Sequence, residues 1–104
     1  MVGGRNSSLA TGAKVLLTTL RKLYLQRGAG RKESALYRGF DHRDRRLVPE
    51  VLGLIASAGL AVKGRAGDAT IWLPVRAETA RVRRILAAPT TCDDPLVAEC
   101  SAVD

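Results

Sequence analysis

The side chains that most often perform chemistry are scarce in this chain of 104 residues, which holds one histidine and two cysteines. His42 could act as a general base or a pH switch, but no serine or cysteine stands near it in an arrangement suited to nucleophilic catalysis. One histidine and two cysteines cannot build an ordinary zinc site without help from carboxylates. The sequence therefore predicts that the protein is not an enzyme and uses no metal or cofactor.

The two cysteines, Cys92 and Cys100, lie in an acidic segment near the carboxyl end. A disulfide between them is conceivable, but we find no secretory signal and no membrane-spanning run of about 18 apolar residues. We therefore expect a cytoplasmic protein with two free thiols and no membrane contact. The basic, glycine-rich segment 28–32 does not follow a predicted strand, so it does not fit a nucleotide-binding loop or suggest a small-molecule substrate.

Positive charge is the clearest compositional signal, with 17 Lys and Arg against 10 Asp and Glu. Residues 1–88 carry all 17 bases and six acids, whereas residues 89–104 carry four acids and no base. Such a basic body favours a polyanionic partner, most often a nucleic acid, although basic residues also serve solubility alone. The acidic tail could fold back over the basic face or act only in solubility.

Three helices are predicted before residue 60. The first begins with Thr11 as its N-cap and ends at Gly28. The residues that define its amphipathic stripe, at spacings of three and four, are Ala13, Leu16, Leu17, Leu20, Leu23, Tyr24 and Arg27. The second helix spans residues 32–39. The third begins at Asp41 or Asp44, accommodates Pro49 in its first turns and ends at Gly59, which suits a left-handed stop.

After Gly59 the apolar period changes from that of a helix to that of a strand, which predicts a hairpin of strands 60–63 and 69–73. We expect its buried face to consist of Leu60, Val62, Ile71 and Leu73. Trp72 then lies on the other face beside Lys63, where it stacks on a partner or packs against a helix. A fourth helix over 76–87 follows. Residues 1–10 are expected to form a flexible arm, and residues 89–104 a mobile acidic tail.

This order of three helices, a hairpin and a helix over residues 11–88 resembles the winged helix-turn-helix domain of bacterial DNA-binding regulators. The likeness lies in the spacing of Leu47-Val48…Leu52…Ile55…Gly59-Leu60-Ala61-Val62-Lys63, where a recognition helix ends in a Gly-Leu turn and runs into the wing. The fold class implied is mainly α with a small β-hairpin, an α+β domain of order α-α-α-β-β-α.

The resemblance implies binding of double-stranded DNA, as a transcriptional regulator or as a maintenance factor of plasmid or phage DNA. The start of the recognition helix would enter the major groove, where arginine can read guanine edges or contact phosphates. The wing and the start of the second helix would contact the backbone. The implied DNA-binding residues are His42, Arg43, Arg45, Arg46, Lys63, Arg65, Arg31 and Lys32.

Two questions stay open at this point. Winged helices also serve as protein–protein interaction modules in larger assemblies, and bases scattered over the surface would favour that function over DNA binding. The helix over 76–87, with Val82, Ile85 and Leu86, is the candidate interface of a homodimer, unless that stripe completes the core of the monomer.

Overall fold

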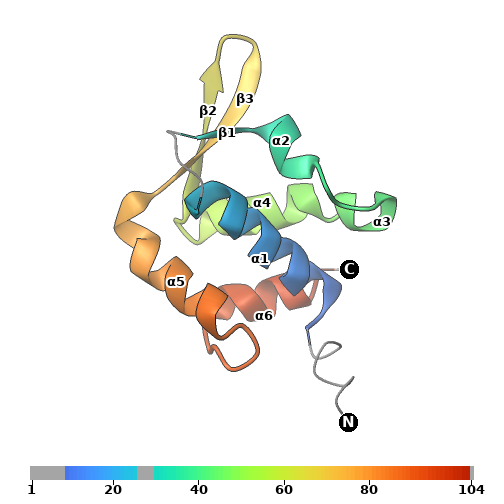
Figure 1. Cartoon of the computed structure of the whole chain (residues 1–104), viewed down its shortest axis with the longest axis vertical. Coiled ribbons are helices and arrows are strands. Elements are labelled where there is room, and N and C mark those ends of the chain that lie inside the picture. Colours follow the sequence, from blue (N-terminus) through green and yellow to red (C-terminus); the bar gives the residue numbers. More distant parts are fainter. Residues whose placement is uncertain (1–8, 26–29, 104) are drawn as a thin grey trace.

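Helix α1 (Thr11–Tyr24) is the element around which the rest of the chain packs, and it contacts α4, α5, α6 and the sheet (Figure 1). The computed structural model describes residues 9–25 and 30–103. Within them the chain is a mixed α+β domain with six α-helices and a three-stranded antiparallel sheet. The other elements are β1 (Arg31–Lys32), α2 (Glu33–Tyr37), α3 (His42–Arg45), α4 (Val48–Ser57), β2 (Ala61–Ala66), β3 (Ala69–Pro74), the 3-10 helix η2 (Arg76–Glu78), α5 (Thr79–Ala87) and α6 (Pro95–Ser101).

Helix α1 confirms the predicted apolar stripe, because the side chains from Ala13 to Tyr24 on that stripe are buried. The predicted cap is wrong, since the N-cap position is Ala10, without a side-chain hydrogen bond, and Thr11 is already helical. Arg27 and Gly28 lie outside the described residues, as does most of the predicted arm over 1–10. Among the residues that the structure describes, no helix is long and apolar enough to cross a bilayer.

The third predicted helix is two helices, α3 and α4. Asp41 caps α3 as expected, because its carboxylate accepts a hydrogen bond from the backbone N–H of Asp44 at 2.8 Å. The break before α4 follows from Pro49, whose nitrogen has no hydrogen and whose ring would clash with the carbonyl one turn earlier. Because α4 begins at Val48, Pro49 lies in its first turn, where no hydrogen bond is lost. Gly59 ends the segment with a φ of +81°.

The sheet contains a strand that the pattern did not reveal. Strand β1, two residues long, pairs with β3, and β2 pairs with the other edge of β3. The predicted hairpin is present and Leu60 is buried as expected, but two predictions are wrong: Trp72, expected on the outer face, is only 5% exposed, whereas Val62, expected to be buried, is 50% exposed. Side chains alternate between the two faces of a strand, so a strand with apolar residues on both faces can bury either one. Burying the face that carries the large indole of Trp72 stabilises the fold more than burying the face of Val62.

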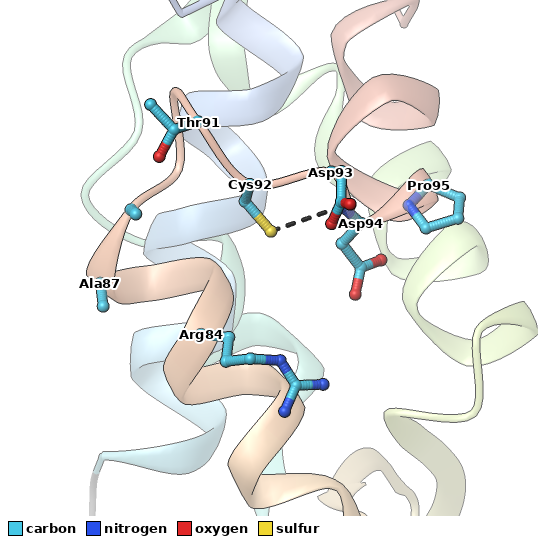
Figure 2. A pocket seen from close by; sticks show the side chains of 8 residues that line it. Arg84, Ala87, Thr91, Cys92, Asp93, Asp94 and Pro95 are labelled. Atoms are coloured by element: carbon cyan, nitrogen blue, oxygen red, sulfur yellow. Dashed lines mark hydrogen bonds between the residues drawn. The ribbon is translucent and has the colours of Figure 1, made fainter.

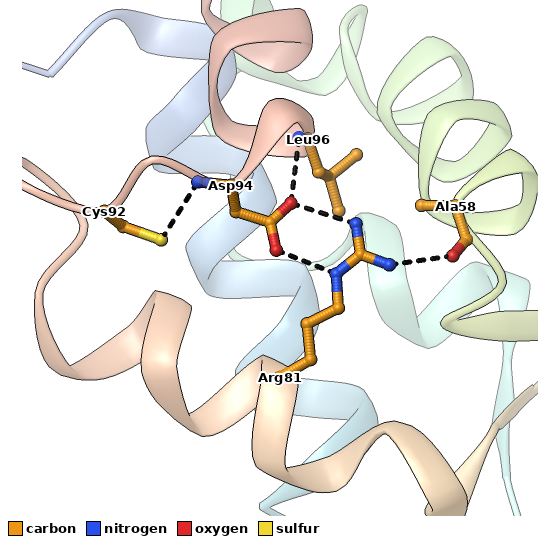
Figure 3. Close-up of polar contacts among 5 residues, drawn as sticks. All are labelled: Ala58, Arg81, Cys92, Asp94 and Leu96. Atoms are coloured by element: carbon orange, nitrogen blue, oxygen red, sulfur yellow. Dashed lines mark hydrogen bonds and ion pairs between the residues drawn. The ribbon is translucent and has the colours of Figure 1, made fainter.

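The carboxyl-terminal segment is not the mobile tail that its composition suggests. Residues 95–101 form α6, which packs on α1 and α4 and buries Leu96, Val97, Cys100 and Val103. Asp94 caps α6, with Pro95 in the first turn, and its carboxylate pairs with Arg81 of α5 (Figure 3). Asp93 and Asp94 therefore precede, and Glu99 belongs to, a helix whose apolar side chains complete the core, so these three acids do not lie on a free tail.

Candidate nucleic-acid interface

The first group of predicted site residues surrounds the short helix α3. His42, Arg43, Arg45 and Arg46 are all exposed or partly exposed. In the part of the chain that the structure describes, the three arginine side chains form no hydrogen bond or ion pair. The cap by Asp41 fixes the first turn of α3, and the backbone N–H of Leu47 donates to the carbonyl of Asp44 at the step into α4. Free guanidinium groups on a short, capped turn can bind phosphate or base edges.

Lys22 of α1, which the sequence pattern did not indicate as a functional residue, contacts the segment that leads into this turn. Its ammonium group donates to the carbonyl of Leu36 at 3.2 Å and to that of Arg38, at the end of α2. It also lies 4.7 Å from the centroid of the Phe40 ring. Partial burial, and then the charge of Arg31, lower the pKa of Lys22 from its usual value. No local pattern could have revealed this contact, because its partners come from another helix.

The second group of predicted residues lies on the sheet around Trp72. The register pairs Arg31 with Trp72 and Trp72 with Lys63, so both bases flank the indole on the same face. The Lys63 ammonium lies 5.7 Å from the centroid of the indole, whose Nε1–H donates to the carboxylate of Glu33 at 2.8 Å. Trp72 thus packs beneath the bases and is not a free stacking platform. Arg65, opposite Thr70, continues this face toward the hairpin tip.

Lys32 belongs to the opposite face of the sheet. It is paired with Ile71, and it is exposed, whereas Arg31 is partly buried. The two neighbouring bases, which the resemblance assigned jointly to backbone contact, therefore point to different sides of β1.

The two groups of basic side chains lie on different elements of the fold. Figure 1 shows α3 at one end of α4 and the hairpin tip at another extremity of the molecule, with α2 between them. Helix α4 itself exposes Pro49, Glu50, Gly53, Ala56 and Ser57, none of which is basic. The exposed face of α4 therefore offers no cation, and the predicted site residues lie on α3 and its C-cap, β1 and the hairpin.

The hairpin is attached to α1 by Tyr24. Its hydroxyl lies 2.5 Å from the carbonyl oxygen of Leu60 and 3.0 Å from that of Val75, at the two ends of the hairpin. The backbone N–H of Val75 also donates to the carbonyl of Leu60, at 3.0 Å. Burial is the main cause of the raised pKa of Tyr24. These contacts fix the orientation of the hairpin, and so of Lys63 and Arg65, relative to the helices.

An open hollow of about 670 Å³ lies where the connection between α5 and α6 turns back, lined by Arg84, Cys92 and Asp93 among others (Figure 2). The backbone N–H of Asp94 donates to the Cys92 sulfur at 3.4 Å. Both cysteines are free thiols. Among the described residues, no group of three His, Cys, Asp or Glu side chains is arranged to hold a metal ion.

The predicted dimer stripe on α5 is occupied within the chain. Val82 and Ile85 are fully buried and Leu86 packs partly against the same core. The exposed positions of α5 include Arg83 and Arg84 instead. The apolar face proposed for a second copy therefore completes the monomer, which was the alternative interpretation of this helix.

Comparisons of the chain with protein-family models, with curated proteins and with solved structures found no match. Conclusions about function therefore depend on the residues and geometry described above.

Proposed function

We propose that this chain is a winged-helix protein that binds double-stranded DNA. The proposal is supported by the succession of α2, a capped turn, α4 and a hairpin, which matches a helix-turn-helix followed by a wing. The observation that carries it is a group of three exposed arginines, Arg43, Arg45 and Arg46, which precede α4 and have no ion-pair partner among the described residues. The amino end of a recognition helix is the part that meets base edges in the major groove.

The charge distribution indicates how the duplex is held. Arginines of α3 contact phosphates and base edges at one groove, while Lys63 and Arg65 of the hairpin contact a neighbouring stretch of backbone. The exposed face of α4 has no Lys or Arg and includes Glu50. Contacts with DNA phosphates therefore contribute more than hydrogen bonds to the edges of the nucleobases. Affinity then falls steeply with salt and depends weakly on sequence, as suits a DNA-maintenance factor or a regulator with a short site.

Fluorescence anisotropy with a labelled duplex of mixed sequence tests the proposal, at low and at raised salt. The double substitution Arg45→Ala/Arg46→Ala removes two cations from the turn. We expect it to weaken binding at least roughly tenfold and to reduce the salt slope by about 0.9 for each phosphate that the variant no longer neutralises. The matched control is Arg83→Ala/Arg84→Ala, which removes the same charge from exposed positions of α5. Failure of the unmodified chain to bind at low salt would overturn the proposal.

A second function, a protein-interaction module, is favoured by the neutral and acidic face of α4 and by the separation of the bases into two groups. The same assay distinguishes the two functions. If the α3 and α5 double substitutions weaken DNA binding equally, the chain attracts polyanions in general and has no DNA site on α3. That result favours the protein-interaction module.

A further inference from the structure

Strand β2 has an open edge along its whole length, whereas β1 covers part of the outer edge of β3. In the sheet order β1-β3-β2, strand β2 pairs with β3 on one side, and no described strand pairs with its other side. The six pairs from Ala61 opposite Pro74 to Ala66 opposite Ala69 run without a bulge, and β2 contains no proline. An unbroken edge of this kind can accept an additional strand from another chain.

The two faces along this edge differ in chemistry. Val62, Gly64 and Ala66 alternate along β2 on one side, where Val62 is 50% exposed. A Cβ at Gly64 would lie 3.6 Å from Ile71 and 3.7 Å from Leu73, so these two aliphatic side chains border the position where Gly64 has no side chain. The other side carries the exposed Lys63 and Arg65.

We propose that the open edge of β2 binds an extended segment of a partner protein in which aliphatic and acidic residues alternate. Added to β2, such a strand directs its aliphatic side chains to the face of Val62 and Gly64, and its carboxylates to the face of Lys63 and Arg65. Lys32, paired with Ile71 on the apolar face, adds a cation at the far border of that face.

A second copy of this chain is a poor occupant of the edge. If two β2 strands pair with their apolar faces on the same side, Lys63 and Arg65 of one copy oppose Arg65 and Lys63 of the other. Like charges directly opposite each other destabilise a strand pair, and cations on an edge are a common protection against self-association. The charge of the edge therefore selects an acidic partner strand.

This inference does not rest on DNA binding, and its test uses no DNA. Anisotropy is measured with a labelled peptide of roughly eight residues in which Val and Glu alternate, a length that matches a typical strand. The control peptide has the same composition, with all valines preceding all glutamates. We expect the alternating peptide to bind the full chain at least roughly tenfold more tightly, since only it matches both faces. Equal affinity of the two peptides overturns the inference.

Two single substitutions locate the site. Arg65→Glu should weaken binding of the alternating peptide roughly tenfold, because an attraction becomes a repulsion on the edge. Arg83→Glu changes an exposed arginine of α5 by the same charge and should alter affinity less than about twofold. Slower exchange of alternate amide hydrogens of β2 on peptide binding identifies strand addition. Equal effects of the two substitutions, or unchanged amide exchange, contradict it.

Discussion

The carboxylate of Asp94 accepts two hydrogen bonds from the guanidinium group of Arg81, at 2.7 Å from Nε and 2.9 Å from Nη2 (Figure 3). The same guanidinium group donates to the carbonyl of Ala58, just beyond α4, at 3.1 Å. Asp94 also accepts from the backbone N–H of Leu96 at 3.0 Å. One carboxylate and one guanidinium group therefore connect α5, α6 and the end of α4.

This ion pair makes the stability of the fold depend on pH. The hydrogen bond with Arg81 is the main cause that lowers the pKa of Asp94 below its usual value. The stabilisation is therefore present above the pKa of an unfolded Asp, about 3.9, and is lost as the pH falls through the lower folded pKa. We expect Asp94→Asn, which keeps a capping oxygen, to cost about 1–3 kcal/mol at neutral pH.

Urea unfolding followed by circular dichroism checks this expectation. The difference in unfolding free energy between the unmodified chain and Asp94→Asn should shrink as the pH falls below about 4. A difference that is independent of pH would show that the charge of Asp94 does not contribute.

The crossing of α1 and α6 depends on Gly12. A Cβ at this position would lie 1.8 Å from the carbonyl oxygen of Cys100, so the helices could not approach as they do. We expect Gly12→Ala to destabilise the fold by about 1–3 kcal/mol, because backbone must move. Gly53→Ala in α4 is the control, since its Cβ meets nothing within 4 Å. The control should stabilise the chain by about 0.8–1 kcal/mol, because alanine favours a helix more than glycine does. If thermal unfolding shows that both substitutions change the stability in the same direction, the close approach of α1 and α6 at Gly12 is contradicted.

Thr19 contributes an unfavourable group to the core. Its side chain is fully buried, and within the described part of the chain its hydroxyl has no hydrogen-bond partner. Thr19→Val replaces the hydroxyl with a methyl of similar size, so it should raise the free energy of unfolding by about 1–3 kcal/mol. Denaturant unfolding measures the change. A clear loss of stability would mean that the hydroxyl is bonded.

The hydroxyl of Tyr24 should hold the base of the hairpin. We expect Tyr24→Phe to cost about 0.5–1.5 kcal/mol and to speed exchange of the Val75 amide hydrogen, which donates to the same carbonyl of Leu60. Tyr37→Phe is the matched control at a partly exposed tyrosine. Equal effects on Val75 exchange from the two substitutions would exclude a specific role for Tyr24.

The two thiols should differ in reactivity. Burial raises the pKa of Cys100 to about 12, so it stays a protonated thiol at mildly alkaline pH, whereas Cys92 is partly exposed. Iodoacetamide should therefore modify Cys92 in the folded chain and modify both thiols only after denaturation. Residues 85–104 form one tryptic peptide that contains both cysteines, so its fragmentation in tandem mass spectrometry identifies the modified residue. Rapid labelling of Cys100 in the folded chain would contradict its burial.

Local patterns were sufficient for the elements whose signals are short in range. The stripe of α1, the cap at Asp41 and the left-handed turn at Gly59 depend on neighbours within one or two helical turns. The α+β class follows from these helical signals together with the change of apolar period after Gly59. The split between α3 and α4 was also encoded locally, by Pro49, but a proline is compatible with either a kinked helix or a new start.

The faces of the hairpin could not be derived from period alone. Ile71, Trp72 and Leu73 are consecutive and apolar, so either face of β3 could be buried, and the choice depends on Glu33 and α1. In the tail, the acids concealed the helical spacing of Leu96, Val97, Cys100 and Val103. For the candidate site, the sequence identified exposed bases, but their division into two groups depends on the tertiary arrangement.

Trp72 is the single tryptophan of the chain. It lies between Arg31 and Lys63 in the sheet, and its indole Nε1–H donates a hydrogen bond to the carboxylate of Glu33. All ultraviolet emission from an indole in this protein therefore originates within the hairpin, where Trp72 pairs with Lys63. Any ligand that engages the neighbouring cations changes the electric field at this chromophore. The chain thus contains its own optical reporter of events at the hairpin, and occupancy there can be followed without an attached dye.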